Sequence, residues 1–240
     1  MAERSALTKV FEAEGESSNA RDFLPEAEYM PQSASRVLDI GCGGGDLACF
    51  LASGAGQVVA LDVSLEVLRA VQAKQTEREL SGLHLVVADV NRLPFRDNCF
   101  DYVVSRYTLH HTELDRSLPE VRRVVARGGR LMLRDIFAPL PSLERWTAWQ
   151  LFKILIKTAL HVRGRGPRSA WRFFRFNVSR ESLDHMLYQN RLVDGQAYRS
   201  THRRWFPGCG FQRLRPRLLF WEAPALRWEK PAAPAPTPEP

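Results

Sequence analysis

A run of glycines directly after a short apolar segment is the feature of this 240-residue sequence that most clearly suggests ligand binding. Residues 37–45 read VLDIGCGGG, which predicts a buried strand that leads into a tight turn and then a helix. Glycine lets the main chain turn sharply and lets a ligand approach it, and the free N–H groups at a helix start favour an anionic group. The turn therefore predicts a site for a nucleotide-like ligand.

The glycine spacing differs from that of dinucleotide sites. Their fingerprint, GxGxxG, would require glycine at position 46 after Gly41 and Gly43, and this sequence has Asp46 there. An aspartate beside a pyrophosphate would also repel it. The pattern is instead Asp39-x-Gly-x-Gly-x-Gly45. A tight turn without a ligand is the alternative, and it would need fewer glycines.

Two further acidic residues follow predicted strands. Asp62 ends QVVALD, where a carboxylate can accept hydrogen bonds from both hydroxyls of an unphosphorylated ribose. The alternative for Asp62 is a helix cap, although Ser64 is better placed for that role. Asp89 ends the next apolar segment, LHLVVAD.

The segments around these residues alternate between strand and helix patterns. Helical stretches separate short apolar segments, which is typical of parallel βαβ units. The glycine pair Gly128-Gly129 is expected to stop the helix that precedes the fifth strand. The predicted strands cover residues 36–40, 57–63, 83–89, 100–106 and 130–139.

Together, these motifs resemble the class I S-adenosylmethionine-dependent methyltransferases, in particular the small-molecule group that contains ubiquinone/menaquinone methyltransferases. The resemblance covers about residues 35–137 and includes Leu109-His110-His111 and the GGRL of residues 128–131. It implies an α/β, Rossmann-like fold, with a mostly parallel sheet, helices on both faces and a helical insertion before the last strands. It also implies S-adenosylmethionine as the cofactor, S-adenosylhomocysteine as the product, and no metal.

The resemblance implies a role for each cofactor residue. The glycine turn would hold the methionine moiety, Asp62 the ribose, and Asp89, with Val90 beside it, the adenine amino group. The residues assigned to the cofactor are Asp39, Gly41, Cys42, Gly43, Gly45, Asp62, Val63, Asp89, Val90 and Ser105.

Methyl transfer from a sulfonium needs alignment and exclusion of water rather than a covalent residue. A phenolic or enolic acceptor would benefit from a base with a pKa near neutrality, and His110 and His111 follow the fourth strand where ligands bind in such sheets. The alternative is that this pair only shapes the pocket. Arg106 and Tyr107 are expected to stack on or orient the acceptor.

The second half of the chain changes in character. We expect an N-terminal flap (1–32), a cofactor-binding core (33–141), a helical insertion or substrate lid (142–200), C-terminal strands (201–229) and a disordered proline-rich tail (230–240). Residues 142–162 are predicted to form one largely apolar helix whose Trp146 and Trp149 contact the substrate. This helix could face a lipophilic acceptor, a lipid surface or the protein's own core.

The first half of the chain is acidic and the second half is basic. Residues 1–120 hold 11 Lys and Arg against 19 Asp and Glu, whereas residues 121–217 hold 21 against 5. The basic half suggests an anionic partner, with a solvated surface as the alternative. We expect a small, lipophilic or aromatic acceptor and possible peripheral contact with an anionic membrane. The alternatives are an RNA or protein methyltransferase that uses the basic half, and a non-catalytic relative that binds the cofactor.

The four cysteines show neither zinc spacing nor a disulfide pattern, and the sequence shows neither a secretory signal nor a long apolar run. We therefore expect a soluble, cytoplasmic protein without a metal. The pattern leaves the oligomeric state open.

Overall fold

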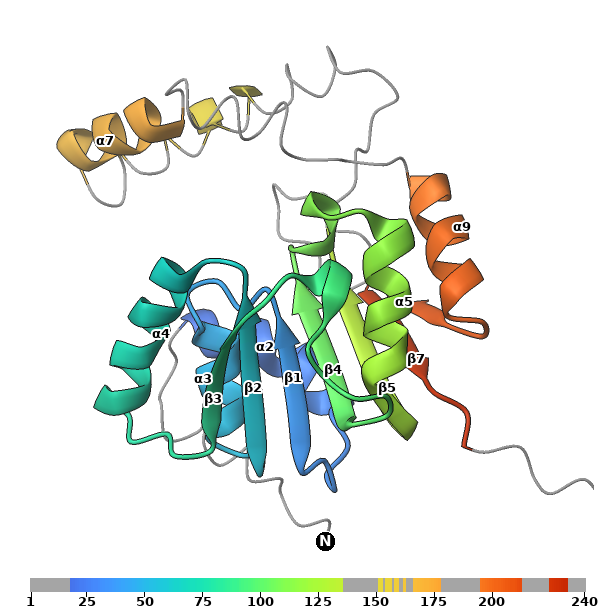
Figure 1. Ribbon diagram of the computed structural model, residues 1–240. Helices are drawn as coiled ribbons and strands as arrows, with labels where there is room; N and C mark the ends of the chain where they lie inside the picture. The colour runs from blue at the N-terminus through green and yellow to red at the C-terminus, as the bar shows by residue number, and fades with distance from the viewer. Residues whose placement is uncertain are drawn as a thin grey trace, which may run out of the picture.

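The computed structural model describes residues 18–135, 195–212 and 225–232, and residues 151–177 apart from 153, 157, 160, 161 and 163–165. Within these residues the chain forms a seven-stranded sheet with the order β3-β2-β1-β4-β5-β7-β6 (Figure 1). Strands β1 to β5 run parallel, and β7 pairs antiparallel with both β5 and β6. The predicted α/β, Rossmann-like fold is confirmed. The strands are β1 (Arg36–Ile40), β2 (Gln57–Asp62), β3 (Leu83–Val87), β4 (Phe100–Arg106), β5 (Val125–Arg134), β6 (Gly210–Gln212) and β7 (Ala225–Glu229).

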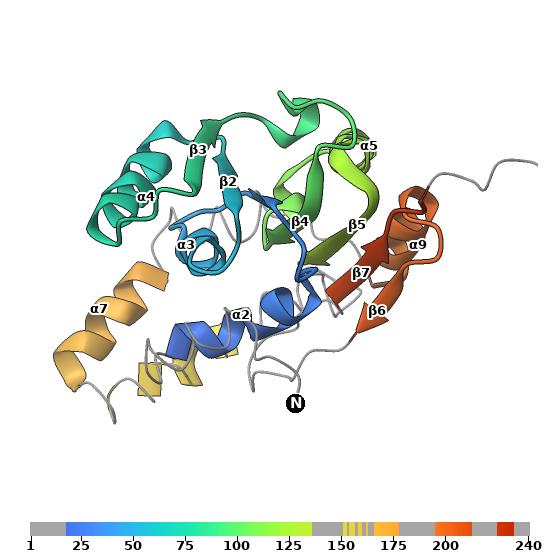
Figure 2. The same ribbon diagram turned by 90° about the horizontal axis from the view of Figure 1, so that it is seen from below.

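Helices cover both faces of the sheet. Figure 2 shows α2 and α3 on one face and α5 and α9 on the other. Side chains of β1 alternate between the two layers: Val37 packs with α2 and α3, whereas Leu38 and Ile40 pack with α5. Asp39 therefore points toward the α2 side. The helices are α2 (Ser18–Tyr29), α3 (Asp46–Ala52), α4 (Leu65–Glu77), α5 (Leu114–Val124), α7 (Pro167–Asn177) and α9 (Gly195–Trp205), and two short 3-10 helices cover Val90–Arg92 and Leu109–His111.

The order of the strands fixes where a ligand can bind. From β1 the chain moves outward through β2 to β3, and it then returns to place β4 on the other side of β1. At such a switch point the loops after β1 and β4 separate, which leaves a crevice at the carboxyl ends of the strands. The glycine turn, Asp62, Asp89 and the two adjacent histidines all follow strands at this edge.

The loop after β3 is held in place by α5. Arg123 donates hydrogen bonds to the main-chain oxygens of Leu93 and Phe95 and to the carboxylates of Asp97 and Glu120. The same Glu120 accepts from the Leu93 N–H. These bonds fix the segment that follows Asp89 against the body of the domain.

The glycine pair before the fifth strand has a different role from the predicted one. Helix α5 ends at Val124, and β5 begins at once, so Gly128 and Gly129 lie inside the strand. The register between β4 and β5 shifts at this point. A Cβ at Gly129 would approach the carbonyl oxygens of Ala126, Asp101 and Phe100 at 2.9, 3.0 and 3.1 Å. Close packing of main chains, rather than the end of a helix, requires glycine here.

The second half of the chain departs from the predicted boundaries. The boundary at residue 200 falls inside α9, which packs against α5, so residues 195–205 are helical and belong to the core. The residues described between 151 and 162 are helical, as predicted for 142–162, and α7 follows them. Trp146, Trp149 and the predicted tail from residue 233 onward lie outside the described residues. In the part of the chain that the structure describes, every helix is too short or too polar to cross a membrane.

Candidate cofactor site

The glycine turn between β1 and α3 is built on left-handed backbone. Gly41, Gly43 and Gly45 have φ angles of +67°, +49° and +75°. A Cβ at Gly41 would overlap the side chain of Thr108, whereas one at Gly43 would meet nothing within 4 Å. The N–H groups of Gly41 and Cys42 both donate to the Leu61 oxygen, at 2.7 and 3.0 Å. The turn is thus tied to the end of β2, and its Gly43 side is open.

Asp62 lies at the end of β2 and faces this turn. One carboxylate oxygen accepts from the Gly43 N–H at 3.1 Å, and the other accepts from the Ser64 N–H at 2.9 Å. The Ser64 hydroxyl, as expected, caps α4 by accepting from the Val67 N–H. Asp62 is therefore available as a fixed pair of acceptors, since each carboxylate oxygen has further lone-pair capacity.

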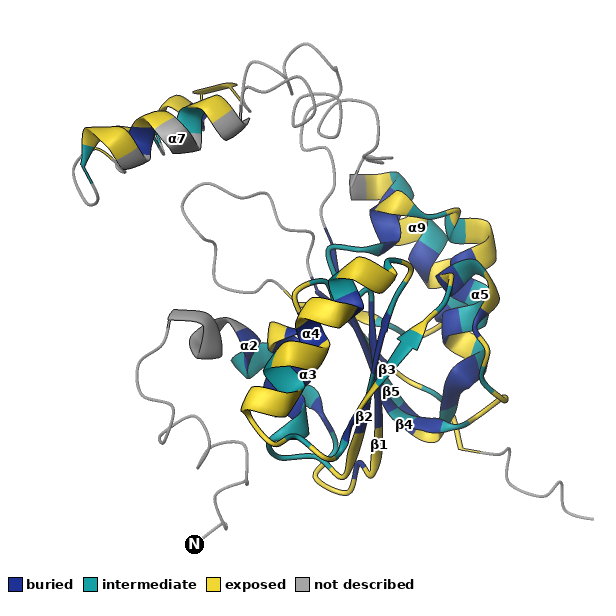
Figure 3. Cartoon of the chain, turned by 60° about the vertical axis from the view of Figure 1, so that its left-hand side comes forward, coloured by how far each residue is buried: buried dark blue, intermediate teal, exposed yellow. Residues whose placement is uncertain are grey.

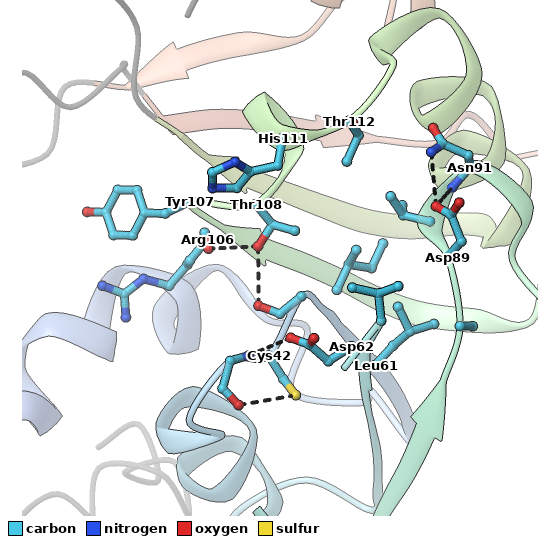
Figure 4. A pocket seen from close by; sticks show the side chains of 16 residues that line it. Cys42, Leu61, Asp62, Asp89, Asn91, Arg106, Tyr107, Thr108, His111 and Thr112 are labelled. Carbon is cyan, nitrogen blue, oxygen red and sulfur yellow. Dashed lines mark hydrogen bonds between the residues drawn. The ribbon is translucent and has the colours of Figure 1, made fainter. Parts of the chain in front are cut away.

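Asp89 lies at the far end of the same edge. One of its oxygens accepts from the main-chain and side-chain N–H groups of Asn91, at 2.8 and 2.9 Å (Figure 4). Val90, which is buried, follows it. The two hydrogen bonds hold the carboxylate of this exposed residue in one orientation.

These groups surround one cavity of about 880 Å³. Its volume is within the range of small-molecule and cofactor sites. Figure 4 shows Asp89 and Asn91 at one end, Asp62 and Cys42 near the middle, and Arg106 and Tyr107 at the other end. The lining residues are Ile40, Gly41, Cys42, Gly43, Leu61, Asp62, Val63, Ala88, Asp89, Val90, Asn91, Arg106, Tyr107, Thr108, His111 and Thr112.

Most of the residues predicted for the cofactor line this cavity, and three do not. Gly45 packs against Val71 of α4, and a side chain there would clash. Ser105 is buried, and its hydroxyl donates to the Ile40 oxygen at 3.0 Å, which joins β4 to β1 just below the site. Asp39 is also buried, beneath the glycine turn. These three residues shape the loop and strand ends that carry the lining residues.

Asp39 is an unusual acid. Burial raises the pKa of its carboxyl to about 7, against the opposing effect of Arg106 and with the nearby acids Glu26 and Asp62 adding to the rise. Its Oδ2 atom has no hydrogen-bond partner. An unsatisfied buried carboxylate oxygen is costly unless a ligand or an ordered water completes its hydrogen bonding.

Cys42 is half-buried in the turn, and burial together with Asp39 and Asp62 raises the pKa of its thiol. The thiol therefore stays neutral and acts as a lining group rather than a nucleophile. Among the described residues there is no group of three or more His, Cys, Asp or Glu that could hold a metal ion.

The two histidines after β4 have different environments. His110 is buried, and its N–H and Nδ1–H both donate to the Asp135 carboxylate, at 3.0 and 2.5 Å. This pairing leaves the proton on Nδ1 of His110. The His111 ring lies 3.9 Å from the His110 ring, centroid to centroid, and lines the cavity. The sequence did not distinguish the two residues, whereas the structure places only His111 on the cavity wall.

Tyr107 reaches the cavity through a strained backbone. Its φ of +55° is uncommon for a residue with a side chain, and its N–H donates to the Arg134 oxygen at 2.7 Å. Its ring lies 5.5 Å from the Arg106 guanidinium and 5.6 Å from that of Arg134. Both Arg106 and Tyr107 line the cavity, and this position does not by itself assign them to the acceptor.

Sequence reasoning missed several contributors. Thr108 fills the space beside Gly41 and donates to its oxygen at 3.2 Å, and Asp135 orients His110. Asp135 had a usable signal, since it is an acid at the carboxyl end of the fifth strand. Glu26 of α2 is fully buried against Arg106 and Arg134, and nothing in its local sequence marks it as different from its acidic neighbours.

The comparisons with known proteins agree with this geometry. Residues 38–133 match the family model described as "Methyltransferase domain". This part of the chain is therefore similar to methyltransferase domains. It is 34% identical over 135 residues to the ubiquinone/menaquinone biosynthesis C-methyltransferase UbiE of Acidiphilium cryptum, a match that covers 53% of each protein. The chain thus spans about half the length of the curated relatives that it matches.

Solved structures support the fold described above. One is phosphoethanolamine N-methyltransferase 2 of Haemonchus contortus in complex with S-adenosylmethionine, with a TM-score of 0.59, 19% identity, and coverage of 82% of this chain and 39% of that one. Another is an S-adenosylmethionine-dependent methyltransferase from Aquifex aeolicus, with a TM-score of 0.53, 16% identity and 87% coverage of both chains. At these identities the likeness shows the fold alone.

The raised pKa of Asp39 leads to a prediction about stability. Because the folded protein disfavours the ionised carboxyl, folding loses stability as the pH rises from the ordinary pKa of 3.8 toward about 7. Asp39→Asn removes this titration. We expect the stability of the variant, relative to the unaltered protein, to be about 1 to 3 kcal/mol more favourable at pH 8 than at pH 5 in urea melts. Asp115→Asn, at an exposed position, is the control. An Asp39→Asn difference that does not change with pH would contradict the buried, protonatable state.

Proposed function

We propose that this protein is an S-adenosylmethionine-dependent methyltransferase that methylates a small, lipophilic or aromatic acceptor by in-line displacement. The observation that carries the proposal is the single cavity that brings the open side of the glycine turn together with the carboxylates of Asp62 and Asp89. The alternatives, an RNA or protein methyltransferase and a non-catalytic relative, are not favoured by the comparisons.

Each end of the cavity suits one part of the cofactor. Asp62 would accept hydrogen bonds from the ribose hydroxyls, and Asp89 from the adenine amino group, with Val63 and Val90 beside the base. The glycine turn and Asp39 would face the amino-acid end. When bound, S-adenosylmethionine supplies an electrophilic methyl group on a sulfonium. The protein's own contribution is to align the acceptor with that methyl and to keep water away.

The ribose contact can be tested by calorimetry with S-adenosylhomocysteine. Asp62→Ala should weaken binding by about 1 to 3 kcal/mol, because it removes acceptors for hydroxyl groups inside the site. Asp62 also accepts a hydrogen bond from the Gly43 N–H, so thermal melts should be used to monitor folding of each variant. The affinity of Asp62→Asn for S-adenosylhomocysteine should lie between those of the unaltered protein and Asp62→Ala. Glu66→Ala, on the exposed start of α4, is the matched control and should bind normally. Unchanged binding by Asp62→Ala would remove the proposed nucleoside site.

For an acceptor that must lose a proton, we assign the base to His111 and a positioning role to His110. Asp135 fixes the ring of His110, and that ring packs on His111, which reaches the cavity. A neutral imidazole on the cavity wall can take a proton from a phenol or an enol as its oxygen or carbon attacks the methyl group.

This assignment predicts a kinetic separation. His111→Gln should lower the rate of methyl transfer by about 10²- to 10⁴-fold and remove the acidic limb of the pH–rate profile, while calorimetric binding of S-adenosylhomocysteine stays unchanged. His84→Gln, an exposed histidine on β3, is the control and should keep the full rate. A His111→Gln enzyme with a normal rate and pH profile would show that the pair only shapes the pocket.

The acceptor class can be tested with a tritiated methyl donor. A relative of this chain is named for ubiquinone and menaquinone biosynthesis, which supports a lipophilic ring as the acceptor. With lipid extract, RNA and total protein offered separately, we expect label in the lipid extract only. Label in RNA or protein would favour the alternative enzyme classes. Asp62→Ala should reduce the label in any fraction that this protein methylates.

We further propose a cytoplasmic protein that contacts anionic membrane surfaces peripherally. Large apolar side chains are exposed at described helical positions between residues 151 and 171, and the sequence of residues 151–177 contains seven Lys and Arg and no Asp or Glu. Figure 3 shows mostly exposed positions along α7. Exposed aromatic and aliphatic groups with only basic charges suit the headgroup region of anionic lipids. The exposed apolar residues are Leu151, Phe152, Leu155, Val162 and Trp171.

Sedimentation with vesicles tests this surface. The protein should bind phosphatidylserine-containing vesicles at low salt and dissociate as salt screens the charges. Replacing Leu155 and Trp171 by Ser should reduce the bound fraction several-fold. Leu65→Ser, which removes a similarly exposed apolar side chain from α4, should not. Failure of the unaltered protein to bind at low salt would eliminate the membrane contact.

A further inference from the structure

Four charged side chains meet beneath the end of the cavity that is farthest from Asp89. Asp39, Arg106 and Arg134 lie near the carboxyl ends of β1, β4 and β5, and Glu26 comes from α2. By alternation along the strands, the three strand residues point toward the α2 side, as do Val37, Val104 and Met132. Glu26 is fully buried, and Asp39 and Arg134 are 2% and 6% exposed.

The contacts within this cluster do not satisfy all of its members. One oxygen of Glu26, Oε1, accepts from Arg134 Nη1 at 3.1 Å. The same oxygen lies 3.3 Å from Arg106 Nε, but the alignment falls short of a hydrogen bond and leaves that nitrogen without a partner. Buried guanidinium groups normally use their donors in full. Arg106 is therefore held beside Glu26 by an ion pair without a hydrogen bond at Nε, and its side chain stays partly exposed.

The charges of the cluster are also unequal. Two guanidinium groups share one oxygen of Glu26. Burial raises the pKa of the other acid, Asp39, to about 7, which favours its neutral form beside the two guanidinium groups.

Arg106 is the member of this cluster that lines the cavity. It lies next to Tyr107 and Thr108, opposite the end that holds Asp89 and Asn91 (Figure 4). A nucleoside held by Asp62 and Asp89 would direct the rest of the cofactor toward Arg106. The group at that end of S-adenosylmethionine is an α-amino acid, and its carboxylate is the part that a guanidinium can bind.

We propose that Arg106 binds the α-carboxylate of the cofactor and that Glu26 of α2 is its positioning residue. This inference rests on the proposed function. It assigns Arg106 to cofactor binding, whereas the sequence-based prediction assigned this residue to the acceptor. It also makes α2, part of the predicted N-terminal flap, a structural element of the cofactor site. A guanidinium donates two parallel hydrogen bonds to a carboxylate, which gives both affinity and orientation.

Calorimetry with three ligands isolates this contact. S-adenosylhomocysteine carries the whole amino-acid end, its decarboxylated analogue lacks only the carboxylate, and 5′-methylthioadenosine lacks the amino-acid end. Arg106→Met should weaken binding of S-adenosylhomocysteine by about 10- to 100-fold and leave the other two ligands within about twofold. Arg106→Lys, which keeps the charge, should lose less.

Glu26→Gln tests the positioning role. It should weaken S-adenosylhomocysteine binding several-fold with little effect on 5′-methylthioadenosine, whereas general damage to the fold would weaken all three ligands equally. Arg130→Met is the matched control, since Arg130 lies on β5 and, like Arg106, contacts α2, where it donates to the Tyr29 oxygen, but it does not line the cavity. It should leave every affinity unchanged.

Two outcomes would overturn this inference while leaving the proposed function in place. One is an equal loss for all three ligands in Arg106→Met and Arg106→Lys, and the other is undiminished binding of S-adenosylhomocysteine by Arg106→Met. If the unaltered protein bound none of the three ligands, the proposed function would fail as well. The affinity of the unaltered protein for 5′-methylthioadenosine therefore distinguishes failure of the carboxylate contact from failure of the site.

Discussion

The path of the main chain after β1 is the constraint on which the rest of the site depends. The chain must leave a buried strand, turn through left-handed dihedral angles at three glycines and start α3, while two consecutive N–H groups donate to Leu61 at the end of β2. Thr108 of the loop after β4 fills the space that a side chain at position 41 would need. The turn is therefore locked between β2 and the loop after β4. Its open side faces the cavity, where Asp62 holds the Gly43 N–H.

Around this turn, buried acids organise side chains that are themselves closer to the ligand. Asp135 accepts two hydrogen bonds from His110, whose ring packs on His111 at the cavity wall. Glu26 forms an ion pair with Arg106, for which we propose a corresponding positioning role. Such buried charges cost folding free energy unless they are paired, and unpaired capacity is found where a ligand completes the network. The strain at Tyr107, next to Arg106, lies at the same edge of the sheet.

The sequence predicted the parts of the molecule that depend on local pattern. Short apolar segments between helices indicated the parallel strands, and the acids at their ends indicated Asp62 and Asp89, because the carboxyl ends of parallel strands meet at one edge. It could not predict Glu26 or the separate environments of His110 and His111, since these depend on how α2 and β5 pack in three dimensions. Gly128 and Gly129 were assigned to the end of a helix because the same residue type serves helix ends and close main-chain contacts. Helix α9 spans residue 200, where composition suggested a boundary, and it packs on α5, a contact that local composition does not reveal.

We propose that the open face of the glycine turn and the carboxylates after β2 and β3 hold one S-adenosylmethionine. A crystal structure of the protein grown with S-adenosylhomocysteine is the decisive experiment. We expect density for the whole ligand in this cavity, with its ribose hydroxyls on Asp62, its adenine amino group near Asp89 and its amino-acid end beside Gly41 and Gly43. Crystals grown at saturating ligand in which the cavity holds only solvent, or in which the ligand lies elsewhere on the molecule, would disprove this binding mode.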